Sequence, residues 1–538
     1  MMAAGTDRCT RRGVGPPVSR ARPLCHSGRV FRLLELLGGL SVATDLGTGA
    51  PPEESLKRAL VATRLARAVG CDQAVISDVI YTSLLQHLGC TAYSHESAAV
   101  WGDDIAAVRL AFLTDFTAPA QVWRQWVPGV AEATGTSRLR VLSTTLTAGK
   151  RVDRDGSEAT CEVARDASRQ LGLPPSVQEG LFHSMTMWNG KGHPPAGGTA
   201  IPVSTRVMHV AAVAVLFALH ADDDAAVAQV RHRAGGYLDP DLADAFGSHA
   251  QEMLDGLHDV DAYRAVLDSE PDPAPLVDDA QTEAVARTFG SVVDLKSPWL
   301  HGHSAGVAQL AATAVGDIGL QDQIWTVRIA GHLHDLGRIG VSSRIWDKAN
   351  PSQTERDQAR LHPYYSERIL ARIPELADVA RLVGQHHEHC DGSGYHRGLG
   401  AAQLSMPSRV LGAADAYRCL VEGRPDQPAL DADRAAERMK DEVKAGHLDG
   451  EAVAGVLKAA GHGRGVRGTL PGGLTPRQVE VLRLVSRGLS NREIAGRLTI
   501  SSRTAEHHVQ DIYTRIGVTS RAAAALFAME HGLVDKHW

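Results

Sequence analysis

Apolar residues recur at spacings of three and four along most of this chain, and few stretches alternate strictly between apolar and polar positions. This pattern predicts helices over 55–69, 305–316, 324–337 and 475–487, among others. The apolar run from Val207 to Ala221 contains His209 and His220, which favours a buried helix over a membrane span. The sequence therefore predicts an all-α protein that has no membrane as a partner.

Two segments interrupt the helical pattern. Residues 269–279 are acidic and rich in proline, and residues 461–473 are rich in glycine. A chain of 538 residues is also too long to fold around one core. We expect a disordered tail over 1–28, a first helical domain over 29–268, a second over 286–460, a linker over 461–470 and a small C-terminal domain over 471–538.

The first two domains repeat each other in sequence. When Arg206 is aligned with Arg409, RAGGYLDPDLADAF (233–246) lies over KAGHLDGEAVAGVL (444–457), and LLQHLG (84–89) lies over HLHDLG (332–337). The matches follow the same order in both domains. We therefore interpret the two domains as copies of one helical unit.

The net charge and the cysteine content bear on the partners of the protein and on the compartment in which it works. The net charge of −6 does not indicate a nucleic-acid partner, so any such site must be local. The seven cysteines are scattered along the chain and are never spaced C-x-x-C, which favours reduced thiols over a disulfide framework. We expect a cytoplasmic protein.

The second domain carries a group of side chains that suit a metal centre. They are His303, His334, Asp335, His362, His386, His387 and Asp415. Imidazoles and carboxylates together are typical ligands of Mn²⁺, Fe or Zn²⁺. A carboxylate such as Asp335 can bridge two cations, and two cations close together can activate water and polarise a phosphoryl oxygen. The composition of the group therefore predicts two divalent transition-metal ions, with Fe or Mn favoured over Zn.

These residues stand in motifs that resemble the HD-GYP family of phosphohydrolases. DLKSPWLHGHS (294–304), LHDLGRIG (333–340), LHPYYSERIL (361–370), HHEHCDGSGYH (386–396) and SRVLGAADAY (408–417) follow the family order. The resemblance implies an all-helical HD fold, a centre of two or three metals and hydrolysis of a phosphodiester such as cyclic di-GMP. It assigns metal-ligand roles to all seven residues. Trp299 stands where three-metal members carry a glutamate, which favours two metals.

The resemblance also assigns Asp335 and Arg338 to catalysis, with Asp335 between the metals and Arg338 steadying the phosphate. Three positions depart from the family pattern. Arg338 replaces the usual lysine, His396 replaces the proline of the GYP triplet, and Arg418 stands where a second acidic residue is expected. These departures favour the alternative that the domain senses a metal or nucleotide ligand without catalysis.

The first domain has lost the ligands at the aligned positions. The His334–Asp335 pair aligns with Gln86–His87, the His386–His387 pair aligns with Ser184–Met185, and Asp415 aligns with Ala212. We therefore interpret residues 29–268 as a degenerate HD-GYP-like copy that binds no metal through these positions.

The C-terminal domain shows clear helix boundaries. Thr475 and Gln478 form a predicted capping box, and Ser490 and Glu493 form a second one that opens a helix of about eight residues. A turn at 498–500 leads to a longer helix over 502–515, which ends at Gly517. A short helix, a turn and a longer helix match the geometry that enters a DNA major groove.

The same residues resemble the LuxR-type helix-turn-helix almost throughout, which implies binding to double-stranded DNA as a homodimer through a last helix near 521–531. The predicted DNA-binding residues are Arg503, Thr504, Glu506, His507 and Gln510. We therefore expect a DNA-binding transcriptional regulator that carries a metal-dependent phosphohydrolase domain.

Overall fold

The computed structural model describes residues 30–116, 118–461 and 471–534. Within these ranges the chain is all-α, and its strands form two short antiparallel pairs. The pairs are β1 (Phe31–Arg32) with β4 (Leu276–Val277), and β2 (Met185–Thr186) with β3 (Gly192–His193). The all-α prediction is confirmed. The predicted tail 1–28, and the predicted linker 461–470 apart from Gly461, lie outside the described residues.

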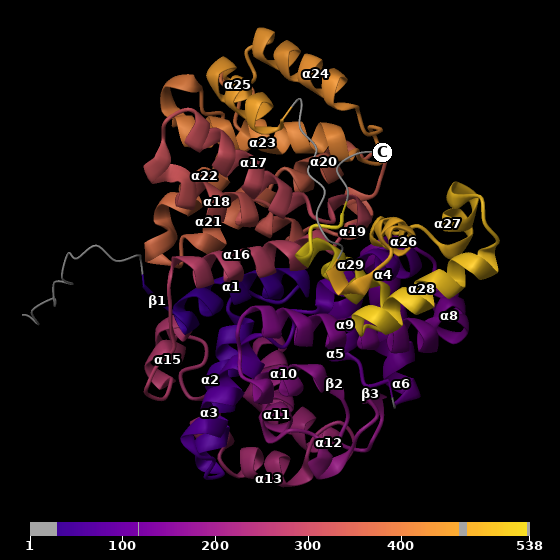
Figure 1. Cartoon of the computed structure of the whole chain (residues 1–538). Helices are drawn as coiled ribbons and strands as arrows, with labels where there is room; N and C mark the ends of the chain where they lie inside the picture. The colour runs from indigo at the N-terminus through magenta and orange to yellow at the C-terminus, as the bar shows by residue number, and fades with distance from the viewer. Residues whose placement is uncertain (1–29, 117, 462–470, 535–538) are drawn as a thin grey trace, which may run out of the picture.

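The first domain is a bundle with an inserted helical subdomain, at the bottom of Figure 1. Its bundle helices are α1 (Leu33–Gly47), α2 (Glu54–Ala68), α3 (Gln73–Leu84), α9 (Gly149–Gln170), α10 (Pro175–Phe182), α11 (Val203–His220), α12 (Asp223–Arg233), α13 (Pro240–Ser248), α14 (Ala250–Leu254) and α15 (Ala262–Ser269). The inserted helices are α4 (Ser94–Trp101), α5 (Asp104–Leu113), α6 (Pro119–Gln121), α7 (Val127–Thr134) and α8 (Arg138–Thr147). Trp101, Trp126 and Val130 belong to a small core of their own within this insertion.

The second domain lies above the first in Figure 1. Its helices are α16 (Asp279–Asp294), α17 (His303–Asp317), α18 (Ile324–Leu333), α19 (Ser343–Trp346), α20 (Gln353–Ala359), α21 (His362–Leu370), α22 (Ala377–Gly384), α23 (Met406–Glu422), α24 (Ala432–Lys444) and α25 (Gly450–Ala459). Helix α17 packs against α18, α23 and α25, so it forms the centre of the bundle.

One sequence-based helix boundary in this region was wrong. Helix α16 begins at Asp279, the last residue of the acidic segment 269–279, where Asp278 and Gln281 form a capping box. The helix predicted over 324–337 ends at Leu333, because the chain turns at the His334–Asp335 pair into the short helix η6 (Leu336–Gly340).

The C-terminal domain contains α26 (Pro476–Ser486), α27 (Asn491–Leu498), α28 (Ser502–Ile516) and α29 (Arg521–Glu530). Both predicted capping boxes are present, and Gly517 ends α28 in the left-handed conformation with φ of 72°. The helix-turn-helix pattern predicted from the sequence is therefore confirmed. In Figure 1 this domain, drawn in yellow, lies beside the junction of the other two.

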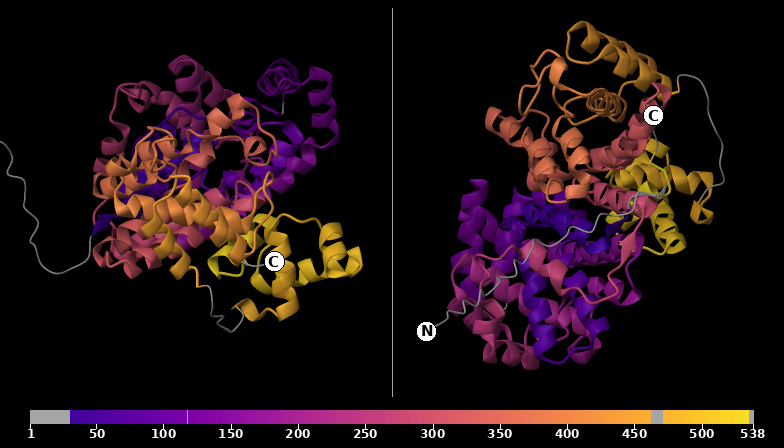
Figure 2. Two further views of the ribbon diagram at one scale, coloured as in Figure 1. Left: turned by 90° about the horizontal axis from the view of Figure 1, so that it is seen from above. Right: turned by 90° about the vertical axis from the view of Figure 1, so that its left-hand side faces the viewer.

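The two large domains share one continuous apolar core. Buried side chains of α1 and α2 belong to the same cluster as those of α16, α17 and α18. Figure 2 shows the two domains stacked without a gap between their ribbons. The contact is reinforced by Lys296 of the second domain, whose fully buried ammonium lies 2.7 Å from the carboxylate of Asp104.

The C-terminal domain docks on this pair through α29. Ala525, Leu526 and Met529 join the large core, and among the helices of the two large domains α29 packs mainly on α9. The carboxylate of Glu162 accepts hydrogen bonds from the backbone amides of Thr519 and Ser520, both at 3.0 Å, at the start of α29. The predicted dimerisation helix therefore packs against its own chain in this structure.

Aligned residues in the two large domains make equivalent contacts. Ser55 donates its amide and hydroxyl to Asp45, both at 3.0 Å, and Ser304 donates the same groups to Asp294 at 3.0 and 2.7 Å. In the first domain these contacts join α1 to α2, and in the second they join α16 to α17.

The two arginines that the sequence alignment pairs are also equivalent in their contacts. Arg206 donates to the carboxylate of Asp239 at 2.7 Å, and Arg409 donates to that of Asp449 at 2.9 Å. Each aspartate caps the helix that follows it. The parallel contacts occur in the same chain order in both domains.

Helix α11 is long and apolar enough to cross a membrane by length and composition alone. However, 72% of its apolar window is buried inside the protein. Met208, Val210 and Ala214 have no exposed surface, so α11 is the core helix that the sequence predicts over 207–221.

Candidate functional site

The His334–Asp335 pair is held at a sharp turn between α18 and η6. Gly337 follows the pair closely, and a Cβ atom at that position would overlap the carbonyl oxygen of His362. The amide of Gly337 also donates to the hydroxyl of Ser366 at 2.7 Å. A glycine at this position therefore lets the turn press against the start of α21, which brings Asp335 to His362.

Asp335 lies between two groups of histidines. Its Oδ2 atom is 3.2 Å from Nε2 of His334 and 3.5 Å from Nε2 of His303. Its Oδ1 atom is 3.2 Å from Nε2 of His362 and 3.7 Å from Nε2 of His386. Each oxygen of one carboxylate therefore faces a different pair of imidazoles.

Asp415 of α23 completes the arrangement from the other side. Its Oδ1 atom is 3.1 Å from Nε2 of His303, and its Oδ2 atom is 3.7 Å from Nδ1 of His387. The structure thus brings all seven predicted ligands together. Six of them are almost fully buried, and the side chain of His387 is 18% exposed at the edge of the cluster.

The outward nitrogens of the histidines have fixed partners. The Nδ1 atoms of His334, His362 and His386 lie 2.9, 2.7 and 2.6 Å from backbone carbonyl oxygens. Nδ1 of His303 lies instead 2.6 Å from the carboxylate of Glu422. These contacts leave the Nε2 atom of each ring directed into the cluster, which is the orientation a metal ligand needs.

Burial and neighbouring charges shift the pKa values of several groups in the cluster. Burial alone would lower the pKa of His303, but the carboxylates of Glu422 and Asp415 raise that pKa to about 9. Burial alone would raise the pKa of Asp335, yet Arg338 and His334 hold that pKa well below its usual value. Burial lowers the pKa of His362 to about 4. The site therefore combines ionised carboxylates with a neutral imidazole, both suited to bind cations.

The donor set is suited to hold metal ions. Among the described residues, neither carboxylate oxygen of Asp335 receives a well-directed hydrogen bond, although both are buried. Open lone pairs on a buried carboxylate are costly unless a cation uses them. His303, His334 and Asp335 form one group of convergent ligand atoms, and His362, His386 and His387 form another. Histidine and carboxylate donors are typical of Mn²⁺, Fe and Zn²⁺ sites.

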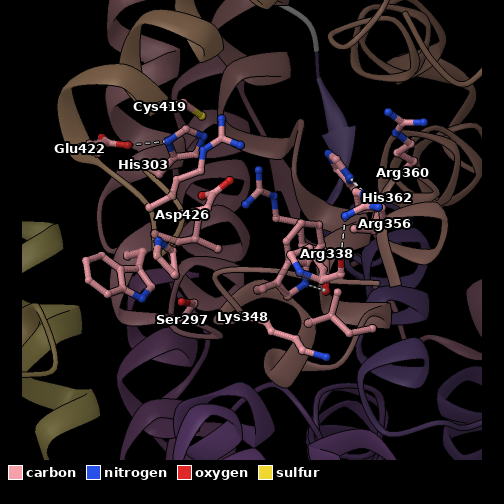
Figure 3. Close-up of a pocket in the computed structure, with 18 of the residues that line it drawn as sticks. Ser297, His303, Arg338, Lys348, Arg356, Arg360, His362, Cys419, Glu422 and Asp426 are labelled. Carbon is pink, nitrogen blue, oxygen red and sulfur yellow. Dashed lines mark hydrogen bonds and ion pairs between the residues drawn. The ribbon is translucent and has the colours of Figure 1, made fainter. Parts of the chain in front are cut away.

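A cavity opens onto this cluster, as Figure 3 shows. His303, His362 and His387 form part of its wall. The cationic side chains that line it are those of Arg338, Lys348, Arg356, Arg360 and Arg424. Sequence reasoning identified only the first of these, because the other four lie on loops and short helices without a recognisable motif. Such a concentration of positive charge favours an anionic ligand.

The predicted catalytic residue Arg338 is one of the residues that line the cavity. Its Nε atom is 2.7 Å from Asp335, and its guanidinium lies 4.6 Å from the ring centre of Trp346. Trp299 also lines the cavity, with 48% of its surface exposed. His396, by contrast, contacts Glu367 and the ring of Tyr364 and is absent from the described cavity lining.

In the first domain, His87, which the sequence aligns with Asp335, lies beside a buried protein cation. The guanidinium of Arg58, only 1% exposed, donates to the carbonyl of Ser83 at 2.8 Å and lies 2.9 Å from Nε2 of His87. Burial lowers the pKa of Arg58. Glu54, at the start of α2, pairs with Arg109 at 2.8 Å. A guanidinium thus lies next to the position that aligns with Asp335 of the second domain.

The candidate DNA-binding helix presents its predicted residues to solvent. Arg503, Glu506, His507 and Gln510 are exposed on α28, whereas Val509 and Ile512 are buried. Thr504 is also exposed, but its hydroxyl lies 2.7 Å from that of Ser501 in the helix cap. The outward face of α28 is therefore available to a partner.

Two family models match this chain. Residues 287–452 match the HD domain, and residues 473–528 match the bacterial regulatory proteins of the luxR family. The chain thus joins an HD domain of the metal-dependent phosphohydrolase class to a LuxR-family domain.

Among individual proteins, 3′3′-cGAMP-specific phosphodiesterase 3 of Vibrio cholerae is 29% identical over 437 residues, covering 80% of this chain and 95% of that protein. The crystal structure of a cyclic GMP-AMP specific phosphodiesterase of V. cholerae matches with a TM-score of 0.56 at 25% identity, covering 81% of this chain and 99% of that one. A cyclic di-GMP phosphodiesterase of Pseudomonas aeruginosa is 30% identical over 176 residues, 32% of this chain and 42% of that protein. The V. cholerae matches are too long for the HD domain alone, so they include the first domain.

Proposed function

We propose that this protein is a DNA-binding transcriptional regulator whose second domain hydrolyses a phosphodiester bond of a cyclic dinucleotide. The observation that carries the proposal is the carboxylate of Asp335, whose two oxygens each face a separate pair of buried imidazoles. A carboxylate so placed is suited to join two divalent cations.

One metal ion would be held by His303, His334 and Asp335, with Asp415 beside them, and the other by His362, His386, His387 and Asp335. When bound, such a pair of cations supplies an activated water and Lewis-acid polarisation of a phosphoryl oxygen. Fe or Mn is favoured over Zn by the oxygen and imidazole ligands.

The side chains of the cavity would bind and orient the substrate. A cyclic dinucleotide carries two phosphate groups, and the cavity is lined by Arg338, which is paired with Asp335, and by Lys348, Arg356, Arg360 and Arg424. Arg338 would steady the phosphate that reacts, while the other cations hold the second phosphate. The names of the relatives from V. cholerae and P. aeruginosa support a substrate of this class.

A second candidate function is sensing of a metal or nucleotide without turnover. It is favoured by Arg338, which is paired with Asp335 at 2.7 Å and stacked on Trp346. A guanidinium held in this way is less free to follow a reacting phosphate than the lysine ammonium that the family usually carries.

We also propose that the first domain, predicted over residues 29–268, is a degenerate copy in which Arg58 replaces the metals. The equivalent contacts of Ser55 and Ser304, and of Arg206 and Arg409, support a common unit. For the C-terminal domain, the exposed residues of α28 support contact with the major groove of double-stranded DNA, by a homodimer if the family pattern holds.

The proposal is tested by incubating the full-length protein, loaded with Mn²⁺ or Fe²⁺, with cyclic di-GMP and with 3′3′-cGAMP. We expect a linear dinucleotide as the product, and we expect Asp335→Asn to abolish it. Saturable binding of either nucleotide without any product would support the sensing function instead. Absence of both binding and product would refute a cyclic dinucleotide as the ligand.

A further inference from the structure

The environment of His303 differs from that of the other buried ligands. Its Nε2 atom points into the cluster, 3.1 Å from Asp415, and its Nδ1 atom lies 2.6 Å from Oε2 of Glu422. The three other buried histidines of the cluster direct Nδ1 to backbone carbonyls. His303 therefore depends on a side chain for its orientation.

Glu422 is the last residue of α23, the helix that carries Asp415. The two residues are seven positions apart, so both side chains lie on the face of α23 that is turned toward α17. The carboxylate is 14% exposed and borders the cavity. Its position thus lets it support a metal ligand from outside the cluster.

Arg418 holds Glu422 in place. The two side chains form an ion pair one helical turn apart on α23. The guanidinium of Arg418 crosses α17 at Gly306, where a Cβ atom would overlap it. Arg418 is only 7% exposed, so its charge needs the partner that Glu422 provides.

We propose that Glu422 is a positioning residue of the metal centre. Arg418 holds Glu422 through an ion pair, and Gly306 leaves room for the guanidinium of Arg418. The carboxylate accepts the Nδ1–H of His303, which fixes the tautomer whose Nε2 lone pair faces the metal. The family resemblance leads one to expect an acidic residue at position 418. In this chain Arg418 pairs with Glu422, and the carboxylate that contacts His303 is that of Glu422, one helical turn after position 418.

This inference rests on the proposed metal centre, so its test measures metal binding separately from hydrolysis. Removing a carboxylate that orients a metal-bound histidine typically weakens metal affinity about 10- to 100-fold. Only the ion that His303 contacts should be affected directly, since His362, His386 and His387 have other partners.

The experiment titrates Mn²⁺ into metal-free full-length protein and compares wild type with Glu422→Gln and Arg418→Met. We expect two Mn²⁺ sites in wild type. In Glu422→Gln, one of them should be about 10- to 100-fold weaker and the other unchanged. Nitrogen NMR of ¹⁵N-histidine-labelled protein should show an altered tautomer for one buried histidine. Arg418→Met should give a smaller loss at the same site, because Glu422 remains.

The matched control is Glu442→Gln. Glu442 lies 2.7 Å from Nδ1 of His447, which is the same kind of contact in a more exposed pair outside the proposed ligand set. It should leave both Mn²⁺ affinities unchanged. Unaltered affinities in Glu422→Gln, or equal losses at both sites together with a lower melting temperature, would overturn the positioning role. Wild type that binds no Mn²⁺ would overturn the proposed centre itself.

Discussion

Replacing the carboxylate of Asp335 is the most direct perturbation of the proposed centre. Asp335→Asn keeps the size of the side chain and removes the negative charge that both pairs of imidazoles face. Two divalent cations about 4 Å apart repel each other by about 17 kcal/mol at an effective dielectric of about 20. Asp335 and Asp415 are the two anions within the predicted ligand set that oppose this repulsion.

Loss of one of these charges should therefore expel at least one metal ion. We expect the weaker site to lose at least about 100-fold in affinity, or roughly 3 kcal/mol. The assay is metal content by mass spectrometry after gel filtration, supported by calorimetric titration. Circular dichroism must show that the variant is folded, since Arg338 loses its ion-pair partner.

The aligned change in the first domain is the control. His87→Ala should leave the metal content unchanged, because His87 contacts Arg58 in a centre that already holds a protein cation. Two metal ions retained by Asp335→Asn would refute the bridging role. Equal metal loss from both variants would refute the interpretation of the first domain as a copy without metal.

Four further outcomes are expected. Gln510→Ala should reduce the discrimination between bases at one base pair by about 1–3 kcal/mol. Arg503→Ala should instead weaken binding to all DNA sequences alike, and it should reduce the slope of the logarithm of the binding constant against the logarithm of salt concentration by about one. Anisotropy titrations against an operator series at two salt concentrations distinguish them, and wild-type behaviour in both would mean that α28 stays outside the groove. Asp104→Asn leaves the fully buried Lys296 unpaired and should destabilise the protein by about 3–5 kcal/mol; a change below about 1 kcal/mol in denaturant unfolding would contradict this. Burial lowers the pKa of His209 to about 4, so the unfolded chain binds its proton first as pH falls from about 6.5, and up to about 3 kcal/mol of stability is lost by pH 4. His209→Gln should make that acid-side loss shallower, and an unchanged pH profile would argue against a buried neutral His209.

The convergence of the seven histidine and aspartate side chains was predictable because each of them stands in a local motif. His334–Asp335 and His386–His387 are adjacent pairs, and the spacing of the motifs matches a known family. The C-terminal domain was predictable for a similar reason, since Thr475 and Ser490 mark helix starts by local capping chemistry.

Residues that act across long sequence distances were not predictable. Glu422 reaches His303 over 119 positions, and Asp104 reaches Lys296 over 192. Neither contact has a local signal, because it arises from how α23 and α5 pack on other elements. The sequence did flag Arg418 as unusual, but only the structure shows that it pairs with Glu422.

The docked position of α29 would couple any dimer formed through this helix to the internal packing of the chain. Leu526 and Met529 can be buried either against this chain's own core or against a second copy, but not both at once. Burying two such side chains is worth about 3–6 kcal/mol. A dimer formed through α29 must first expose that surface, so its formation depends on protein concentration and on any ligand that loosens the contact with α9. The fraction of a two-fold symmetric operator that is bound by a dimer would then depend on the fraction of chains in which α29 has left its own core.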